Sequence, residues 1–249
     1  MSIKHLLLIS LAAITLPSGA FAEGAHEGAH WTYKEVAKWG TLSKEFAECS
    51  VGKEQSPIDI KATVKADLQP IKFDYKLSGL NIVDNGHTIQ VNYDPGSSIS
   101  IAGSTYQLVQ FHFHHPSEEK INGKSQDMVI HLVHQNAERK LAVVAVLVRA
   151  GDQNPVLQTL WTNIPGEKEK AKTAKDITVD ASQFLPSDRN YYTFTGSLTT
   201  PPCSEGVNWF VLKTPITASS SQLATFAKIY PNNARPVQAL YGRVVRTSN

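Results

Sequence analysis

The chain has 249 residues, with 24 lysines and arginines against 22 aspartates and glutamates, and so carries a net charge of +2 at pH 7. This near balance argues against nucleic acid or an anionic membrane surface as the partner. Hydrophobic residues make up 41% of the chain, which is enough for a large core, and all-β domains of this size often remain undivided.

The N-terminus reads as a signal peptide over residues 1–22. Lys4 and His5 precede an apolar run over 6–14, and Ala20-Phe21-Ala22 supplies a small-x-small cleavage motif. The run is shorter than the ~20 residues that a membrane span requires. We therefore expect cleavage after Ala22, export to the periplasm or the medium without membrane insertion, and one mature domain over 23–249.

Two cysteines, Cys49 and Cys203, are present in the chain. In an exported protein, two distant cysteines favour a disulfide over two buried free thiols. Such a bridge would join the N-terminal part of the mature chain to its C-terminal third.

The middle of the chain is dominated by short stretches of alternating or β-branched residues, and these predict strands. Asn85-Gly86 and Asp94-Pro95-Gly96 supply turns between them. The run over 141–148 is continuously apolar, which is typical of a central strand buried on both faces. The predicted strands cover 71–75, 80–84, 88–93, 98–101, 105–114, 128–135, 141–149, 191–195 and 207–212.

Helices are expected to be few and peripheral. The best candidates are 154–162, with Asn154 as N-cap and Pro155 at the first helical position, and 219–230. A helical turn is expected over 43–48. The charged segment 166–176 is expected to be solvated, without a functional role. The predicted fold is mainly β (α+β), a single domain built on a large, mostly antiparallel twisted sheet, and several apolar strand edges are candidates for a homodimer surface.

The chemistry centres on histidines in the strands. Side chains two residues apart share one face of a strand, roughly 6.5–7 Å apart, so His112 and His114 point the same way. A third histidine is either His131 or His134, which face opposite sides of the next strand, and the spacing does not choose between them. Three imidazoles with an open position form the ligand set of a catalytic zinc site. Taken alone, a single strand histidine can equally be a hydrogen-bonded core residue that binds no metal.

A wider set of motifs identifies a family. The sequence resembles the alpha-class carbonic anhydrases, specifically the exported bacterial type, over about residues 31–245. The motifs that carry the resemblance are Gln55-Ser56-Pro57-Ile58, Asn85-Gly86-His87, Gln110-Phe111-His112-Phe113-His114, Pro116-Ser117-Glu118, His131-Leu132-Val133-His134, Gly196-Ser197-Leu198-Thr199-Thr200-Pro201-Pro202, Val207-Asn208-Trp209 and Asn233-Ala234-Arg235-Pro236-Val237-Gln238.

The resemblance implies a zinc lyase that interconverts carbon dioxide and bicarbonate, with Zn²⁺ held by His112, His114 and His131. Zinc lowers the pKa of its bound water from ~15.7 to ~7, an effect for which carbonic anhydrase is itself the standard example. The resulting hydroxide attacks carbon dioxide. The resemblance makes His134 a structural residue on the opposite strand face.

The resemblance also assigns roles to residues around the metal. Thr199 would donate its hydroxyl proton to Glu118 and accept a hydrogen bond from the hydroxide, and His87 would shuttle protons to solvent. Without the resemblance, Glu118 reads as an exposed loop carboxylate and His87 as a solvent-exposed turn residue. The apolar substrate pocket would comprise Val133, Val143, Leu198, Thr200, Val207 and Trp209. The polar wall that holds the water chain would comprise Tyr33, Asn85, Gln90 and Gln110.

One position departs from the family pattern. The family has a glutamate two residues before the third zinc histidine, where it hydrogen-bonds the free ring nitrogen, and this chain has Val129. Losing such a partner typically costs ~10–100-fold in metal affinity or activity. We therefore expect zinc to leave this protein faster than a Val129→Glu variant, with Asp127, on the same strand face, as a candidate substitute.

Two other functions compete with this assignment. His112-x-His114 followed by Glu118 loosely matches the first cupin motif and would make Glu118 a metal ligand, but no second cupin motif precedes His131. A catalytically weakened zinc-binding relative is the alternative that Val129 favours. Metal geometry distinguishes the first alternative, and an assay of carbon dioxide hydration distinguishes the second.

Overall fold

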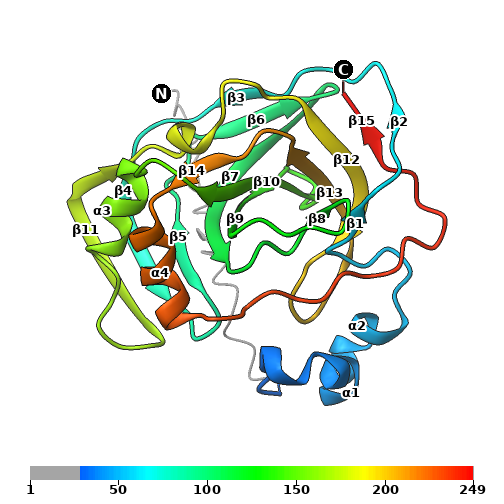
Figure 1. Ribbon diagram of the computed structural model, residues 1–249, viewed down its shortest axis with the longest axis horizontal. Coiled ribbons are helices and arrows are strands. Elements are labelled where there is room, and N and C mark those ends of the chain that lie inside the picture. Colours follow the sequence, from blue (N-terminus) through cyan, green and yellow to red (C-terminus); the bar gives the residue numbers. More distant parts are fainter. Residues whose placement is uncertain (1–28, 249) are drawn as a thin grey trace, which may run out of the picture.

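The computed structural model describes residues 29–248, so the predicted signal peptide lies outside the described residues. Figure 1 shows strands through most of the molecule, with the helices at its periphery. The helical elements are η1 (Tyr33–Lys38), α1 (Trp39–Leu42), η2 (Lys44–Phe46), α2 (Glu48–Val51), α3 (Pro155–Trp161), η3 (Ala181–Phe184) and α4 (Ser220–Ile229). The strands are β1 (Asp59–Ile60), β2 (Val64–Lys65), β3 (Lys72–Asp74), β4 (Ser78–Asp84), β5 (Ile89–Asn92), β6 (Ser98–Ile101), β7 (Ser104–His114), β8 (Lys120–Ile121), β9 (Met128–Gln135), β10 (Leu141–Ala150), β11 (Lys170–Val179), β12 (Tyr191–Ser197), β13 (Glu205–Leu212), β14 (Ile216–Ala218) and β15 (Arg246–Thr247).

Within residues 29–248 the main sheet has 13 strands, and its principal path runs β11-β4-β5-β7-β9-β10-β13-β12-β15-β2. Most neighbours pair antiparallel, while β10 pairs parallel with both β13 and β14. The predicted large, mostly antiparallel sheet is confirmed. None of the helices in this part of the chain is long and apolar enough to cross a bilayer.

The central strand β10 divides the interior into two apolar clusters because its side chains alternate between the faces of the sheet. Ala142, Val144 and Val146 belong to the larger cluster, which packs against α3 and α4, whereas Val143 and Ala145 belong to the smaller one. All of these residues are buried, as expected of a strand covered on both sides.

A bulge in β7 determines which face its histidines occupy. The register between β7 and β9 shifts between Leu108 and Gln110. Leu108 precedes the bulge and Phe111 follows it, yet both pack in the larger apolar cluster. The extra residue therefore reverses the alternation, and His112 and His114 point away from that cluster.

Side-chain caps begin several helices, and the predicted Asn154 cap is confirmed. Asn154 accepts hydrogen bonds from the backbone N–H groups of Val156 and Leu157 at 3.0 and 3.1 Å, with Pro155 beginning α3. Ser43 caps the short η2 by accepting a hydrogen bond from the Glu45 N–H at 3.3 Å. Ser219 and Gln222 form a reciprocal capping box at the start of α4.

The charged segment 166–176 is largely exposed, as expected, but most of it forms a strand that was not predicted. β11 pairs antiparallel with β4 at one edge of the sheet (Figure 1) and is largely exposed. Exposed edge strands commonly carry lysine, which discourages pairing with another chain. The apolar alternation that reveals a half-buried strand is therefore absent here.

The predicted disulfide is present. Cys49 and Cys203 are bonded across a sequence separation of 154 residues. Closing a loop of this length restricts the unfolded chain and stabilises the fold by at most about 4–5 kcal/mol. Disulfides are typical of oxidising compartments, while cleavage after Ala22 stays a prediction.

Candidate metal centre

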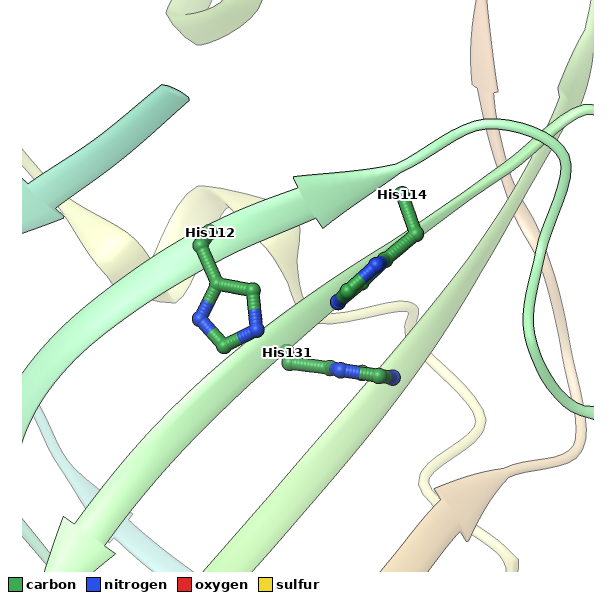
Figure 2. A group of neighbouring side chains, drawn as sticks. All are labelled: His112, His114 and His131. Carbon is green, nitrogen blue, oxygen red and sulfur yellow. The ribbon is translucent and has the colours of Figure 1, made fainter. Parts of the chain in front are cut away.

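Three imidazoles converge on the face of β7 and β9 opposite the larger apolar cluster (Figure 2). His112 and His131 lie directly opposite each other across the antiparallel pair, and His114 is two residues farther along β7. One ring nitrogen from each of the three lies within 4.8 Å of the other two. His114 and His131 are buried, and His112 is slightly more exposed.

The structure resolves the choice that the spacing left open. His131 joins the cluster, while His134 lies on the other face, where it is buried and its Nε2 is 2.9 Å from the Tyr75 hydroxyl. Burial lowers the pKa of His134 to about 3, so this residue is a neutral core histidine.

Hydrogen bonds to oxygen acceptors orient the three converging rings. His112 Nδ1 is 2.9 Å from Gln110 Oε1, His114 Nδ1 is 2.8 Å from the Asn233 carbonyl oxygen, and His131 Nε2 is 3.0 Å from Glu119 Oε1. An amide oxygen and a carbonyl oxygen can only accept, so Nδ1 of His112 and Nδ1 of His114 carry protons, and Glu119 offers His131 Nε2 a carboxylate oxygen. The other nitrogen of each ring is then the one available as a ligand, as metal-binding histidines require.

The chemistry of this donor set fits a divalent metal. Burial, followed by repulsion from His131, holds the pKa of both His112 and His114 well below its ordinary value, so the rings are neutral as ligands must be. His114 Nε2 is buried and has no hydrogen-bond partner among residues 29–248, which a coordinated cation would supply. The metal-capable group in this part of the chain consists of three imidazoles without a carboxylate, unlike the cupin arrangement.

Glu118 is buried beside the imidazoles and is not an exposed loop residue. Its Oε2 lies 3.5 Å from His114 Nε2 and 3.9 Å from His131 Nδ1, while its Oε1 accepts a hydrogen bond from the Arg235 backbone N–H at 2.7 Å. The Thr199 side chain lies near enough to lower the pKa of Glu118. Burial raises the pKa of Glu118 to about 8, against the opposing effect of His131, and a nearby divalent cation would draw it back down.

Three residues of the predicted polar wall, Asn85, Gln90 and Gln110, lie along β5, β7 and the turn before β5. Asn85 Oδ1 accepts the backbone N–H groups of His87 and Thr88 at 3.0 and 2.9 Å, which shapes the turn, and Asn85 Nδ2 donates to Gln90 Oε1 at 3.3 Å. Gln90 lies directly opposite His112 across the β5–β7 pair. The polar side chains thus lead from the turn toward the imidazoles.

His87 is half-buried at this turn and stacks on Trp31, with ring centroids 3.7 Å apart and planes inclined by 8°. Tyr33, also in the predicted polar wall, makes an edge contact with the same Trp31 ring. Burial lowers the pKa of His87 from its ordinary value. Asn233 links this turn to the metal centre, because its Nδ2 donates to the His87 carbonyl at 3.1 Å.

The predicted apolar pocket residues lie on the other side of His131. Its ring makes an edge contact with Trp209 at 4.9 Å between centroids. Most of the predicted pocket residues share the smaller apolar cluster, with Leu198 packed at its margin; they are Val133, Val143, Val207 and Trp209. Thr200 is half-buried in the loop that the disulfide anchors, where its carbonyl accepts the Cys203 N–H at 2.8 Å.

The sequence predicts no individual role for three residues of the site, Asn233, Arg235 and Glu119. Asn233 and Arg235 belong to a motif that marks the family, but nothing in their spacing shows that they fix His114 and Glu118. The sequence does not single out Glu119, and the carboxylate that it suggests as a partner of His131 is Asp127. Asp127 is wrong as a partner of His131, because it is exposed and its Oδ2 accepts the Ala150 N–H at 2.7 Å. The sequence feature that could have marked Glu119 as a site residue is its position next to Glu118.

Comparisons with known proteins agree with this geometry. The family model for eukaryotic-type carbonic anhydrase matches residues 34–249. A carbonic anhydrase from Nostoc sp. is 46% identical over 212 residues, covering 83% of this chain and 80% of the relative. One from Pectobacterium carotovorum is 41% identical over 239 residues, covering 94% and 98%. The structure of an alpha-carbonic anhydrase from Thermovibrio ammonificans with sulfanilamide matches with a TM-score of 0.85 and 41% identity, covering 88% and 99%.

Proposed function

Since this chain belongs to the eukaryotic-type, or alpha, carbonic anhydrase family, we propose that it binds Zn²⁺ through His112, His114 and His131 and interconverts carbon dioxide and bicarbonate at that site. The observation that carries the proposal is the convergence of three imidazoles whose outer nitrogens are already hydrogen-bonded. When bound, zinc would acidify a coordinated water so that a hydroxide nucleophile is available near neutral pH.

Glu118 and Thr199 would orient the attacking solvent oxygen. The Arg235 N–H holds the Glu118 carboxylate in place, and the nearby Thr199 hydroxyl would donate its proton to that carboxylate when Glu118 is ionised. The Thr199 oxygen is then left to accept a hydrogen bond. A solvent oxygen that donates to it turns a lone pair toward the substrate, which places the nucleophile for attack.

The apolar residues beside His131 would hold the substrate. Carbon dioxide offers little to hydrogen-bond, so it is better accommodated by Val143, Val207 and Trp209 than by a polar surface. The polar wall on the opposite side would hold solvent for proton transfer. The two halves of the site therefore separate substrate binding from proton export.

Metal removal tests the proposed function. The zinc-loaded protein is expected to hydrate carbon dioxide, to lose that activity when a chelator removes the metal, and to recover it when one equivalent of Zn²⁺ is restored. Stopped-flow measurement with a pH indicator reads the reaction, and metal analysis reads the zinc content. Hydration that persists without metal would contradict the proposal, and zinc binding without hydration would support the weakened relative instead.

His87 is expected to carry protons from the site to the solvent. Replacing it with alanine should lower kcat by about 10²-fold at low buffer concentration, with the zinc content unchanged, because proton transfer would lose its positioned base. Added imidazole should restore part of the rate. An unchanged kcat at low buffer concentration would rule out this role.

The pH dependence of that effect follows from the lowered pKa of His87. The ring accepts a proton only while it is neutral, and burial keeps it neutral to a lower pH than the ordinary value of 6.5. The difference between the native protein and His87→Ala should therefore persist as the pH falls through 6.5.

A further inference from the structure

Glu119 contacts the third histidine from outside the strand that carries it. Its Oε1 lies 3.0 Å from His131 Nε2, and only 1% of Glu119 is exposed. The second oxygen, Oε2, is buried without a hydrogen-bond partner among residues 29–248. Burying a carboxylate is costly unless it is paired, and the contact with His131 offsets part of that desolvation cost.

The loop that carries Glu119 is held firmly. The Ser117 hydroxyl donates to the Glu119 carbonyl at 2.8 Å and accepts the Gln126 N–H at 2.8 Å. Immediately afterwards, β8 pairs with β1, where Lys120 lies opposite Asp59. Backbone contacts on both sides of Glu119 thus fix the direction from which its side chain approaches His131.

On β9 itself, Val129 cannot accept a hydrogen bond from His131. It is completely buried, lies opposite His114 on β7 and Leu147 on β10, and packs in the smaller apolar cluster. No carboxylate therefore reaches His131 from the strand position where the family resemblance calls for one. Glu119 supplies a carboxylate to the same ring from the loop.

We propose that Glu119 is the positioning residue for His131, holding it as the Nε2-protonated tautomer whose Nδ1 faces the metal centre, and that it replaces the carboxylate absent at Val129. This inference rests on the proposed zinc site. A carboxylate acceptor fixes the ring orientation and raises the basicity of the opposite nitrogen, which strengthens metal retention. The same geometry reverses the expectation that Val129→Glu alone would retain zinc better, because His131 Nε2 already donates to Glu119.

The rate at which zinc passes to an excess of a strong chelator tests this inference. Glu119→Ala should release zinc about 10–100-fold faster than the native protein. Glu119→Gln should fall between the two, because its amide oxygen still accepts a hydrogen bond but lacks the charge. Glu138→Gln serves as the matched control, since Glu138 is exposed and pairs with Lys140 at the surface, and it should release zinc at the native rate.

A double variant separates positioning from general stability. Glu119→Ala combined with Val129→Glu should return zinc release toward the native rate, because a carboxylate again reaches His131. Ring ¹⁵N shifts of His131 provide a second readout: the Nε2-protonated tautomer should dominate in the native protein and in the double variant, and be lost in Glu119→Ala.

Native release rates in folded Glu119→Ala, or in Glu119→Gln if the alanine variant does not fold, would overturn the inference. So would a double variant that loses zinc as fast as Glu119→Ala. Failure of the proposed function looks different, because the native protein itself would then bind no zinc or leave carbon dioxide unhydrated.

Discussion

Replacing His131 with glutamine is expected to abolish stoichiometric zinc binding and to lower carbon dioxide hydration by at least ~10³-fold, since the reaction depends on the metal-acidified nucleophile. His131 contributes to the metal centre from β9, while the other two imidazoles come from β7. Two ligands on one strand leave a zinc site incomplete, because a catalytic site takes three protein ligands and one solvent molecule. Metal analysis and a stopped-flow hydration assay measure the two effects.

His134→Gln is the matched control for that variant. It removes a buried histidine from the same strand, three positions away, but on the opposite face. The loss of its hydrogen bond with Tyr75 should lower the free energy of unfolding by about 1–3 kcal/mol, with zinc retained. A His131→Gln protein that kept one zinc ion, or a His134→Gln protein that was folded and had lost it, would contradict the assignment of ligands.

Replacing Thr199 with alanine is the second prediction with a large effect. The variant should lose about 10²-fold in kcat/KM while keeping its zinc, because removing one oriented hydrogen-bonding group from an active site typically costs 10²–10³-fold. Thr199 is buried and its side chain lowers the pKa of Glu118, which supports the proposed hydrogen bond between the two residues. Thr195→Ala, an exposed threonine on β12, should leave the rate unchanged.

A double-mutant cycle with Glu118→Gln tests whether the two residues act together. If Glu118 works by directing the Thr199 hydroxyl, the double variant should be no slower than Thr199→Ala alone, because each single change already disrupts the unit. Independent losses that multiply in the double variant would show that Glu118 acts on the reaction by another route.

Much of the sheet was predictable because its pattern is local. The apolar run of β10 and the Asn154 cap of α3 follow from residues close in sequence, and both are confirmed. The strand β11 was not predictable in this way. Lys170 and Lys172 are exposed at this edge, so the segment lacks the alternation by which a half-buried strand is recognised.

In the candidate site, too, the features set by neighbouring residues were predictable and those set by distant segments were not. The pairing of His112 with His114 is visible at a spacing of two residues, but the choice of His131 over His134 depends on which face of β9 meets the imidazoles of β7. The resemblance to a family made that choice, and the structure agrees with it. The contact between Glu119 and His131 depends on how a loop folds back over a strand, which no periodicity encodes.

The bridge between Cys49 and Cys203 encloses a covalent ring that contains every proposed zinc ligand as well as Glu118, Glu119 and Thr199. A protease that cuts one peptide bond inside this ring linearises it without releasing a fragment. A cut in the exposed turn at Asn122–Gly123, for example, would leave His114 and His131 on pieces that remain tethered through sulfur. The ligands of a nicked molecule would stay at a high effective concentration relative to one another, so the damaged protein has a route to reassembly that two separated fragments would lack.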